Sequence, residues 1–138
     1  MRGYELLEHT ADIGLRVRGK DIEEIFIYAA EGMFAIIAGT EGIETREEIK
    51  IECEAEDIEE LLVNWLSELL YCFNVKRILG KEFFIEKLEE NRVKGGVKGE
   101  EFDEERHLLL NEIKGVTYHN LRIEKKGEMW EAEVIFDV

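Results

Sequence analysis

The stretch Glu8–Gly19, EHTADIGLRVRG, contains the pattern from which the fold can be worked out. After Asp12, apolar side chains at Ile13, Leu15 and Val17 alternate with glycine and arginine, which predicts a strand with one buried and one exposed face. A short polar segment, HTAD, precedes this strand and separates it from another apolar run. The two runs could form a hairpin or a single strand bent at a bulge. A half-buried strand needs an apolar layer to cover it, and the rest of the chain must supply that layer.

Two amphipathic helices are predicted, and each begins with the same four residues, DIEE. Asp21–Glu24 opens the first helix and Asp57–Glu60 opens the second. In both, the aspartate can accept the backbone N–H three residues later, and the glutamate can reach back. Apolar residues then recur at spacings of three and four, to about Ile37 and Asn74 respectively. The repeated strand-then-helix unit suggests an internal duplication, with convergence on a favourable helix start as the alternative.

The remaining regular segments read as strands. They cover residues 45–55, 82–88, 92–100, 117–124 and 128–138. Turns at Glu89–Asn91 and at Lys126–Gly127 join four of them into two hairpins, and residues 103–111 could form a short helix. The expected fold class is α+β, with a mostly antiparallel sheet packed against two long amphipathic helices. A chain of 138 residues without a linker is expected to be one domain, residues 1–138.

The composition is strongly acidic, with 33 acidic and 18 basic residues and a formal net charge of −15. Such a surface repels phosphate backbones, so tight direct binding of nucleic acid is not expected. A divalent cation or a basic face on a partner protein fits the sign of the charge better. No segment has the pattern of a membrane span or a secretion signal, and a cytoplasmic location is expected.

The sequence offers little for nucleophilic catalysis. Cys53 and Cys72 lack the spacing of a zinc site or a redox pair and are predicted to be small core residues. His9, His107 and His119 have no serine or cysteine in a recognisable catalytic motif beside them, which favours hydrogen-bonding or surface roles. The glycine-rich run VKGGVKGE lacks the ending of a phosphate loop and instead indicates a hairpin with bulges.

Carboxylates stand near both ends of the chain. Asp12 closes the polar segment, and Asp137 is followed by Val138, whose main-chain carboxylate adds a further negative group. If the two ends abut, these oxygens would repel one another unless a cation lies between them, and oxygen ligands suit Ca²⁺ or Mg²⁺. The alternatives are that Asp12 is an ordinary turn residue and Asp137 a solvated acid at a frayed end. Lys114, a lone base in NEIKGVTYH, could reach an anion or pair with Glu112.

Four segments together resemble the archease family, in order and over essentially the whole chain: HTADIGLRVRG, LLVNWLSELLY, EIKGVTYHNLRIE and VIFDV. The resemblance implies a small α+β protein that activates the tRNA-splicing RNA ligase. Such a protein promotes guanylylation and turnover of the ligase without being an enzyme itself. The resemblance also implies a divalent metal site made by Asp12, Asp137 and the terminal carboxylate of Val138, most simply for Ca²⁺, with Mg²⁺ or Mn²⁺ as alternatives. It marks Lys114 as a functional position.

Two other functions stay open at this stage. A chaperone-like partner of a tRNA methyltransferase would depend on exposed apolar patches. A stand-alone metal-dependent hydrolase would use Asp12 and Asp137, with His9 as a base.

Overall fold

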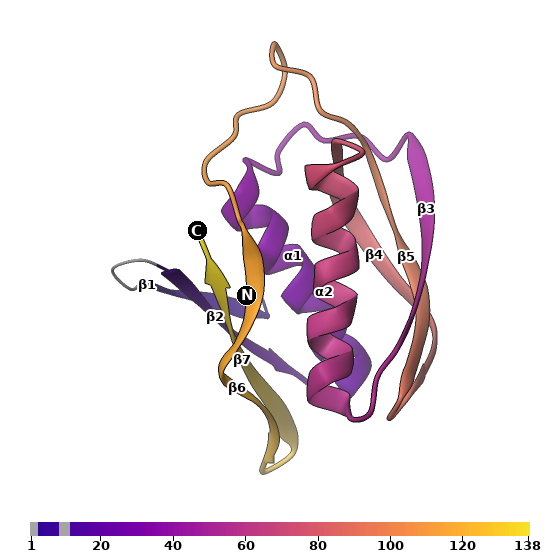
Figure 1. The fold of residues 1–138 in the computed structure, drawn as a ribbon, viewed down its shortest axis with the longest axis vertical. Helices are drawn as coiled ribbons and strands as arrows, with labels where there is room; N and C mark the ends of the chain where they lie inside the picture. Colours follow the sequence, from indigo (N-terminus) through magenta and orange to yellow (C-terminus); the bar gives the residue numbers. More distant parts are fainter. Residues whose placement is uncertain (1–2, 9–11) are drawn as a thin grey trace.

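The structure is a computed structural model and describes residues 3–8 and 12–138. In this part of the chain it contains seven strands and two helices, which confirms the α+β class. The elements in chain order, labelled in Figure 1, are β1 (Tyr4–Glu8), β2 (Asp12–Gly19), α1 (Ile22–Ile37), β3 (Glu47–Glu54), α2 (Ile58–Asn74), β4 (Ile78–Glu89), β5 (Arg92–Glu101), β6 (Gly115–Lys126) and β7 (Met129–Asp137).

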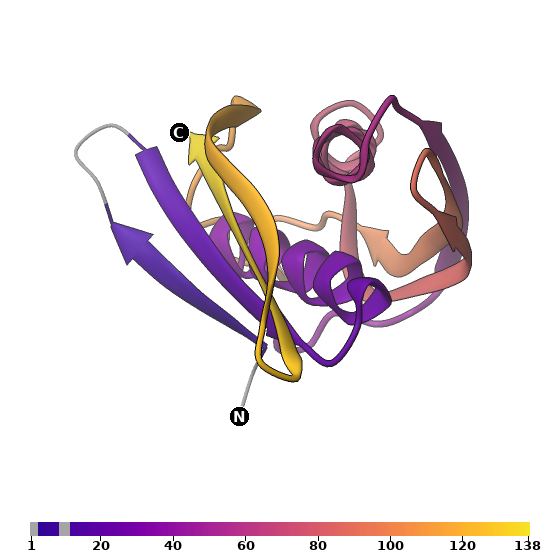
Figure 2. The same cartoon turned by 90° about the horizontal axis from the view of Figure 1, so that it is seen from below.

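The strands divide between two antiparallel sheets, which the sequence pattern did not indicate. One sheet has four strands in the order β1-β2-β7-β6, and the other has three in the order β3-β5-β4. Figure 2 shows the four-stranded sheet, in indigo and yellow, on one side of the helices and the three-stranded sheet on the other. Because β1 and β2 pair as an antiparallel hairpin, the alternative of one strand bent at a bulge is excluded.

Both helices begin where the repeated DIEE motif predicts. The Asp21 carboxylate accepts the backbone N–H of Glu24 at 2.9 Å, and the Glu24 side chain accepts the backbone N–H of Lys20 at 2.8 Å. Asp57 accepts the N–H of Glu60 at 2.8 Å in the same way. These bonds satisfy N–H groups that a helix start otherwise leaves unpaired. The two units lie in different sheets, because β2 belongs to one and β3 to the other, and the duplication stays a prediction.

The helices fill the space between the sheets. Helix α1 packs against β2 and β4, and α2 packs against β6 and β3. The largest fully buried side chain is Trp65, and its indole N–H donates to the carbonyl of Phe26 at 3.1 Å, so the core contains no unpaired indole there. Cys53 and Cys72 are buried as predicted, and burial raises the pKa of the Cys53 thiol to about 11. Neither described helix is long and apolar enough to cross a membrane.

The glycine-rich run lies in β5, between β3 and β4, and is part of a hairpin with bulges as predicted. Register shifts occur in β4 between Gly80 and Glu82 and between Ile85 and Lys87. A Cβ atom at Gly99 would lie 1.8 Å from the carbonyl oxygen of Leu79, so this position has no room for a side chain. The glycines therefore serve close approach of backbones rather than phosphate binding.

The connector of residues 102–114, between β5 and β6, differs from expectation. The short helix suggested for residues 103–111 is not formed, and the segment contains a turn instead. Leu109 pairs with Ala38 in an isolated bridge, and the N–H of Leu110 donates to the carbonyl of Ile37 at 2.8 Å. The connector thus satisfies backbone groups at the C-terminal end of α1, and these bonds favour an extended chain over a helix.

Candidate functional site

The candidate site lies where β2 begins and β7 ends, at one end of the two central strands of the four-stranded sheet. Asp12, the first residue of β2, is directly opposite Asp137, the last residue of β7. Directly opposed residues project to the same face of an antiparallel sheet, with Cβ atoms about 4.5–5.5 Å apart. The two segments that carry the predicted acidic residues are therefore neighbours in space.

The next residues on the same face show how unusual this pair is. An Arg16 guanidinium nitrogen lies 3.7 Å from a carboxylate oxygen of Glu133, and Arg18 Nε lies 3.0 Å from one of Glu131. On this face, opposite charges thus face each other in two pairs, the uncharged pair of Gly14 and Ile135 follows, and two acids face each other in the last pair. Like charges directly opposed across a sheet are destabilising unless another charge compensates them.

The Asp12 carboxylate has an oxygen without a partner. Its Oδ1 atom is buried, and no residue in the described part of the chain donates a hydrogen bond to it. A buried carboxylate oxygen without a donor is costly, so this atom is a candidate position for a ligand. The Asp137 side chain is exposed, which would let a cation enter from solvent. Hard oxygen donors of this kind fit Ca²⁺, Mg²⁺ or Mn²⁺.

The two aspartates do not by themselves complete a coordination shell. Among residues 3–8 and 12–138, no three His, Cys, Asp or Glu side chains are grouped so that they could hold a metal ion. Val138 follows the pair and packs its half-buried side chain against the core, and its carboxylate as a third ligand stays a prediction. His9, the base of the hydrolase alternative, lies outside the described residues.

Lys114 is the residue before β6, and its backbone reaches the same end of the sheet. Gly115, the first residue of β6, pairs with Asp137, and the backbone N–H of Lys114 donates to the Asp137 carbonyl at 2.7 Å. Ile113 is almost completely buried and anchors the segment in the core. The Lys114 side chain is exposed and has no ion-pair partner among the described residues, so the suggested pair with Glu112 is not observed.

A hollow of about 540 Å³ lies beside Lys114. One wall comes from Phe73 and Asn74 at the C-terminal end of α2 and from Arg77 just after it, and the other comes from residues 109–114 of the connector. The Asn74 amide donates to the carbonyl of Ile113 at 3.4 Å and joins the two walls. A group bound in this hollow would be within reach of the Lys114 amine.

A second cluster of titratable groups was not predicted from the sequence. Glu100 is 4% exposed and accepts hydrogen bonds from Arg106 at 2.8 Å, from the backbone N–H of Glu44 at 2.8 Å and from His107 Nε2 at 3.0 Å. The Nδ1 atom of His107 accepts the N–H of Asp103, so the neutral ring carries its proton on Nε2. The Arg106 and Glu44 bonds lower the pKa of Glu100 to about 2.

This cluster fixes the connector to the end of β5, and Glu100 and His107 at its centre are buried. The predicted hydrogen-bonding role of His107 is confirmed, and His119 is exposed in β6, as a surface role requires. The signal in the sequence was weak: an arginine and a histidine follow a run of acids, with nothing to show which acid they meet.

Comparison with known proteins agrees with the four motifs. A model of the Archease protein family (MTH1598/TM1083) matches residues 4–138. The Protein archease of Methanosarcina mazei is 40% identical over 139 residues, which cover 98% of this chain and 95% of that protein. The Protein archease of Pyrococcus furiosus is 38% identical over 143 residues, and the match covers all of both chains.

Solved structures show the same relationship. The solution structure of protein 1598 from Methanobacterium thermoautotrophicum superposes with a TM-score of 0.85 at 35% identity over the whole of both chains. The crystal structure of an archease from Thermotoga maritima, described as a possible chaperone, gives a TM-score of 0.62 at 27% identity over 96% of this chain and 94% of that one. From these matches and from the fold, the chain belongs to the archease family.

Proposed function

We propose that this archease is a non-catalytic partner protein of the tRNA-splicing RNA ligase, which it activates by promoting guanylylation and turnover in tRNA splicing. Membership of the family supports this proposal at a general level. The observation that carries it is the direct opposition of Asp12 and Asp137, with one buried Asp12 oxygen left without a donor among the described residues.

In this proposal Asp12, Asp137 and the terminal carboxylate of Val138 hold a divalent cation, Ca²⁺ in the first instance and Mg²⁺ or Mn²⁺ otherwise. When bound, the cation supplies positive charge that can neutralise charge on a phosphate group. The antiparallel register of β2 and β7 keeps the two aspartates on one face, and the backbone bond from Lys114 fixes the carbonyl of Asp137. The Lys114 amine adds an exposed positive charge beside the pair, where a phosphate of the partner's nucleotide could meet it.

The remaining chemistry of the chain suits a partner protein better than a catalyst. Both cysteine thiols are buried, and burial raises the pKa of each above its ordinary value. A net charge of −15 disfavours RNA and favours contact with the basic, phosphate-binding cleft of an enzyme. We place this interaction in the cytoplasm.

The test is ligase guanylylation by labelled GTP, with and without this protein. Asp12→Asn and Asp137→Asn keep the shape of each side chain but remove its charge, and each should lower the stimulation at least about tenfold. Glu128→Gln is the matched control, because Glu128 is an exposed acid in the turn at the opposite end of β7. Its stimulation should equal that of the wild type. Full stimulation by both aspartate variants would reject the proposal.

A chaperone-like role, for which a tRNA methyltransferase is one candidate partner, is the second function with an observation in its favour. Leu108, Leu109 and Leu110 in the connector are 67%, 41% and 53% exposed, an apolar run that a protein partner could cover. The Thermotoga maritima relative is described as a possible chaperone. Binding of the methyltransferase that survives loss of both aspartates but is lost in Leu108→Asp and Leu110→Asp would favour this role.

A further inference from the structure

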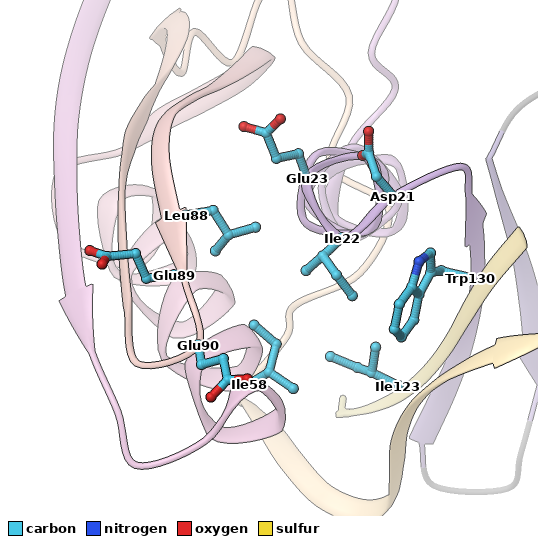
Figure 3. Close-up of a pocket in the computed structure, with 9 residues that line it drawn as sticks. All are labelled: Asp21, Ile22, Glu23, Ile58, Leu88, Glu89, Glu90, Ile123 and Trp130. Carbon is cyan, nitrogen blue, oxygen red and sulfur yellow. The ribbon is translucent and has the colours of Figure 1, made fainter.

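An apolar groove with an acidic edge lies at the other end of the molecule from Asp12 and Asp137. Its volume is about 710 Å³, and five elements line it, including the N-termini of both helices. The apolar part comes from five half-buried side chains: Ile22, Ile58, Leu88, Ile123 and Trp130. Figure 3 shows the aliphatic side chains pointing toward a shared space and the Trp130 indole forming one wall of it.

The charged residues that line the groove are all acidic: Asp21, Glu23, Glu89 and Glu90. Figure 3 shows Glu23 and Glu90 at the edge, on opposite sides of the apolar space, whereas Glu89 points away. Neither Glu23 nor Glu90 has an ion-pair partner in the described part of the chain. Asp21 uses one carboxylate oxygen for the cap of α1 and keeps the other free.

Trp130 adds a polar group to the apolar wall. The buried Trp65 donates its indole N–H to a backbone carbonyl, but the indole N–H of Trp130 has no acceptor among the described residues. Tryptophan residues that combine a large apolar ring with a free N–H are common at the centre of protein interfaces. The groove therefore offers apolar area, a hydrogen-bond donor for a backbone carbonyl, and negative charge at its edge.

We propose that this groove binds a segment of a partner protein in which a bulky apolar side chain is flanked by Lys or Arg. The apolar side chain would cover the half-buried floor, and the flanking bases would meet Glu23 and Glu90. Nucleic acid is disfavoured because the lining carboxylates repel phosphate. The proposal does not depend on the metal site, since Trp130 and Asp137 are seven positions apart in β7, which corresponds to about 23 Å.

A second copy of this chain is the less suitable occupant. Among the described residues, an exposed apolar residue beside bases is Val75, which precedes Lys76 and Arg77 just after the C-terminal end of α2. The guanidinium of Arg77 already lies over the ring of Phe73, 4.5 Å from its centre. The groove includes the opposite end of the same helix, so copies joined this way would associate head to tail, and such contacts form open chains unless the rotation closes.

The experiment uses Trp130 as its reporter, because Trp65 is fully buried and should not respond. Short synthetic peptides without aromatic residues are titrated into the whole protein while tryptophan emission is recorded. One peptide has a leucine flanked by lysine and arginine, a second replaces those bases with glutamate, and a third keeps the bases but replaces the leucine with glycine. The first alone should shift the emission and saturate, and Trp130→Phe should abolish the shift.

Variants of the acidic edge of the groove test where the peptide binds. Charge reversal by Glu23→Lys with Glu90→Lys should weaken binding of the first peptide about tenfold. The control reverses two exposed acids of the connector, Glu104→Lys with Glu105→Lys, and has the same net charge. Its affinity should stay close to that of the wild type. Calcium-dependent thermal stabilisation should be unchanged in both double variants, which separates this proposal from the metal proposal.

Several results would overturn the proposal. One is no emission change with any peptide, and another is equal binding of the glutamate peptide or equal weakening by the control reversal. Tighter binding of free spermidine than of the first peptide would assign the groove to a small cation instead. If sedimentation shows self-association, and Glu23→Lys with Glu90→Lys abolishes it, the groove would instead bind a second copy of this chain.

Discussion

Glu100 and Glu131 show how this chain buries a carboxylate when no ligand is required. Glu131 accepts hydrogen bonds from Arg122 at 2.7 Å and from Arg18 at 3.0 Å, and Glu100 is held by Arg106 and its neighbours. These contacts, led by the Arg122 and Arg106 bonds, lower the pKa of each carboxyl to about 2. The buried oxygen of Asp12 has no such donor in the described structure, and this contrast supports the proposal that a cation binds there.

Both glutamates should make stability depend on pH in a defined window. Their pKa values fall from 4.5 in the unfolded chain to about 2 in the folded protein, so their contribution is fully present above pH 4.5 and is lost as pH falls toward 2. Glu100→Gln and Glu131→Gln should each lower the free energy of unfolding at neutral pH by about 1–3 kcal/mol. The free energy of unfolding, measured by urea denaturation at several pH values in this range, should change less with pH in the double variant than in the wild type. An equal pH dependence in the two proteins would show that these two glutamates are not its source.

The position of a single residue could be predicted from the sequence where that residue lies in a regular strand. Asp12 and Asp137 lie on strands whose alternation can be read directly, so their face was predictable once the strands were recognised. The Glu100–Arg106–His107 cluster was not predictable, because it depends on how an irregular connector turns back on β5. The ion pair of Glu131 with Arg18 brings together residues 113 positions apart, which no local pattern encodes.

At the scale of single elements, the two helix starts give a direct test of the DIEE motif. Asp57→Ala removes the side-chain acceptor for the N–H of Glu60 and should lower the free energy of unfolding by about 1 kcal/mol. Glu68→Ala, at an exposed position inside the same helix, is the control and should stay within about 0.5 kcal/mol of the wild type. Urea denaturation of both variants makes the comparison, and equal values would show that the cap contributes nothing.

The glycines of β5 make a second prediction at this scale. Gly99→Ala places a methyl group against the carbonyl of Leu79, so a backbone must shift, and the free energy of unfolding should fall by about 1–3 kcal/mol. Gly39→Ala is the matched control, because a Cβ atom there meets nothing within 4 Å. Thermal unfolding of both variants should separate them clearly. If Gly99→Ala is as stable as Gly39→Ala, then β4 and β5 do not approach each other as closely at this position as the structure shows.

Element boundaries followed the sequence pattern closely except where glycine interrupts it. The two helices occupy the predicted ranges, and both predicted hairpin turns are present. Strand β4 begins at Ile78 rather than Glu82, because Gly80 and the bulge after it hide the alternation at its start. The division into two sheets was not predictable, since helices α1 and α2 each cover both of them and hydrophobic alternation does not say which strands pair.

On the scale of the whole molecule, the pairing of β2 with β7 is the decisive feature. It brings the first and last sequence motifs together at one end and places the Trp130 groove at the other end of the same strand. A partner could therefore occupy the groove while the aspartate pair stays accessible. From the sequence, the aspartate pair could be predicted only on the assumption that the two ends of the chain meet. Which strands pair across more than a hundred residues is set by packing of the whole core.

Thermal unfolding in calcium and in EDTA, at matched ionic strength, tests the central claim most directly. Calcium should raise the melting temperature of the wild type, because a ligand that binds the folded state stabilises it by mass action. The double variant Asp12→Asn with Asp137→Asn should show no rise, and in EDTA it should be at least as stable as the wild type, since the facing charges are gone. If calcium leaves the wild type unchanged, or raises both proteins equally, the two aspartates do not form a cation site.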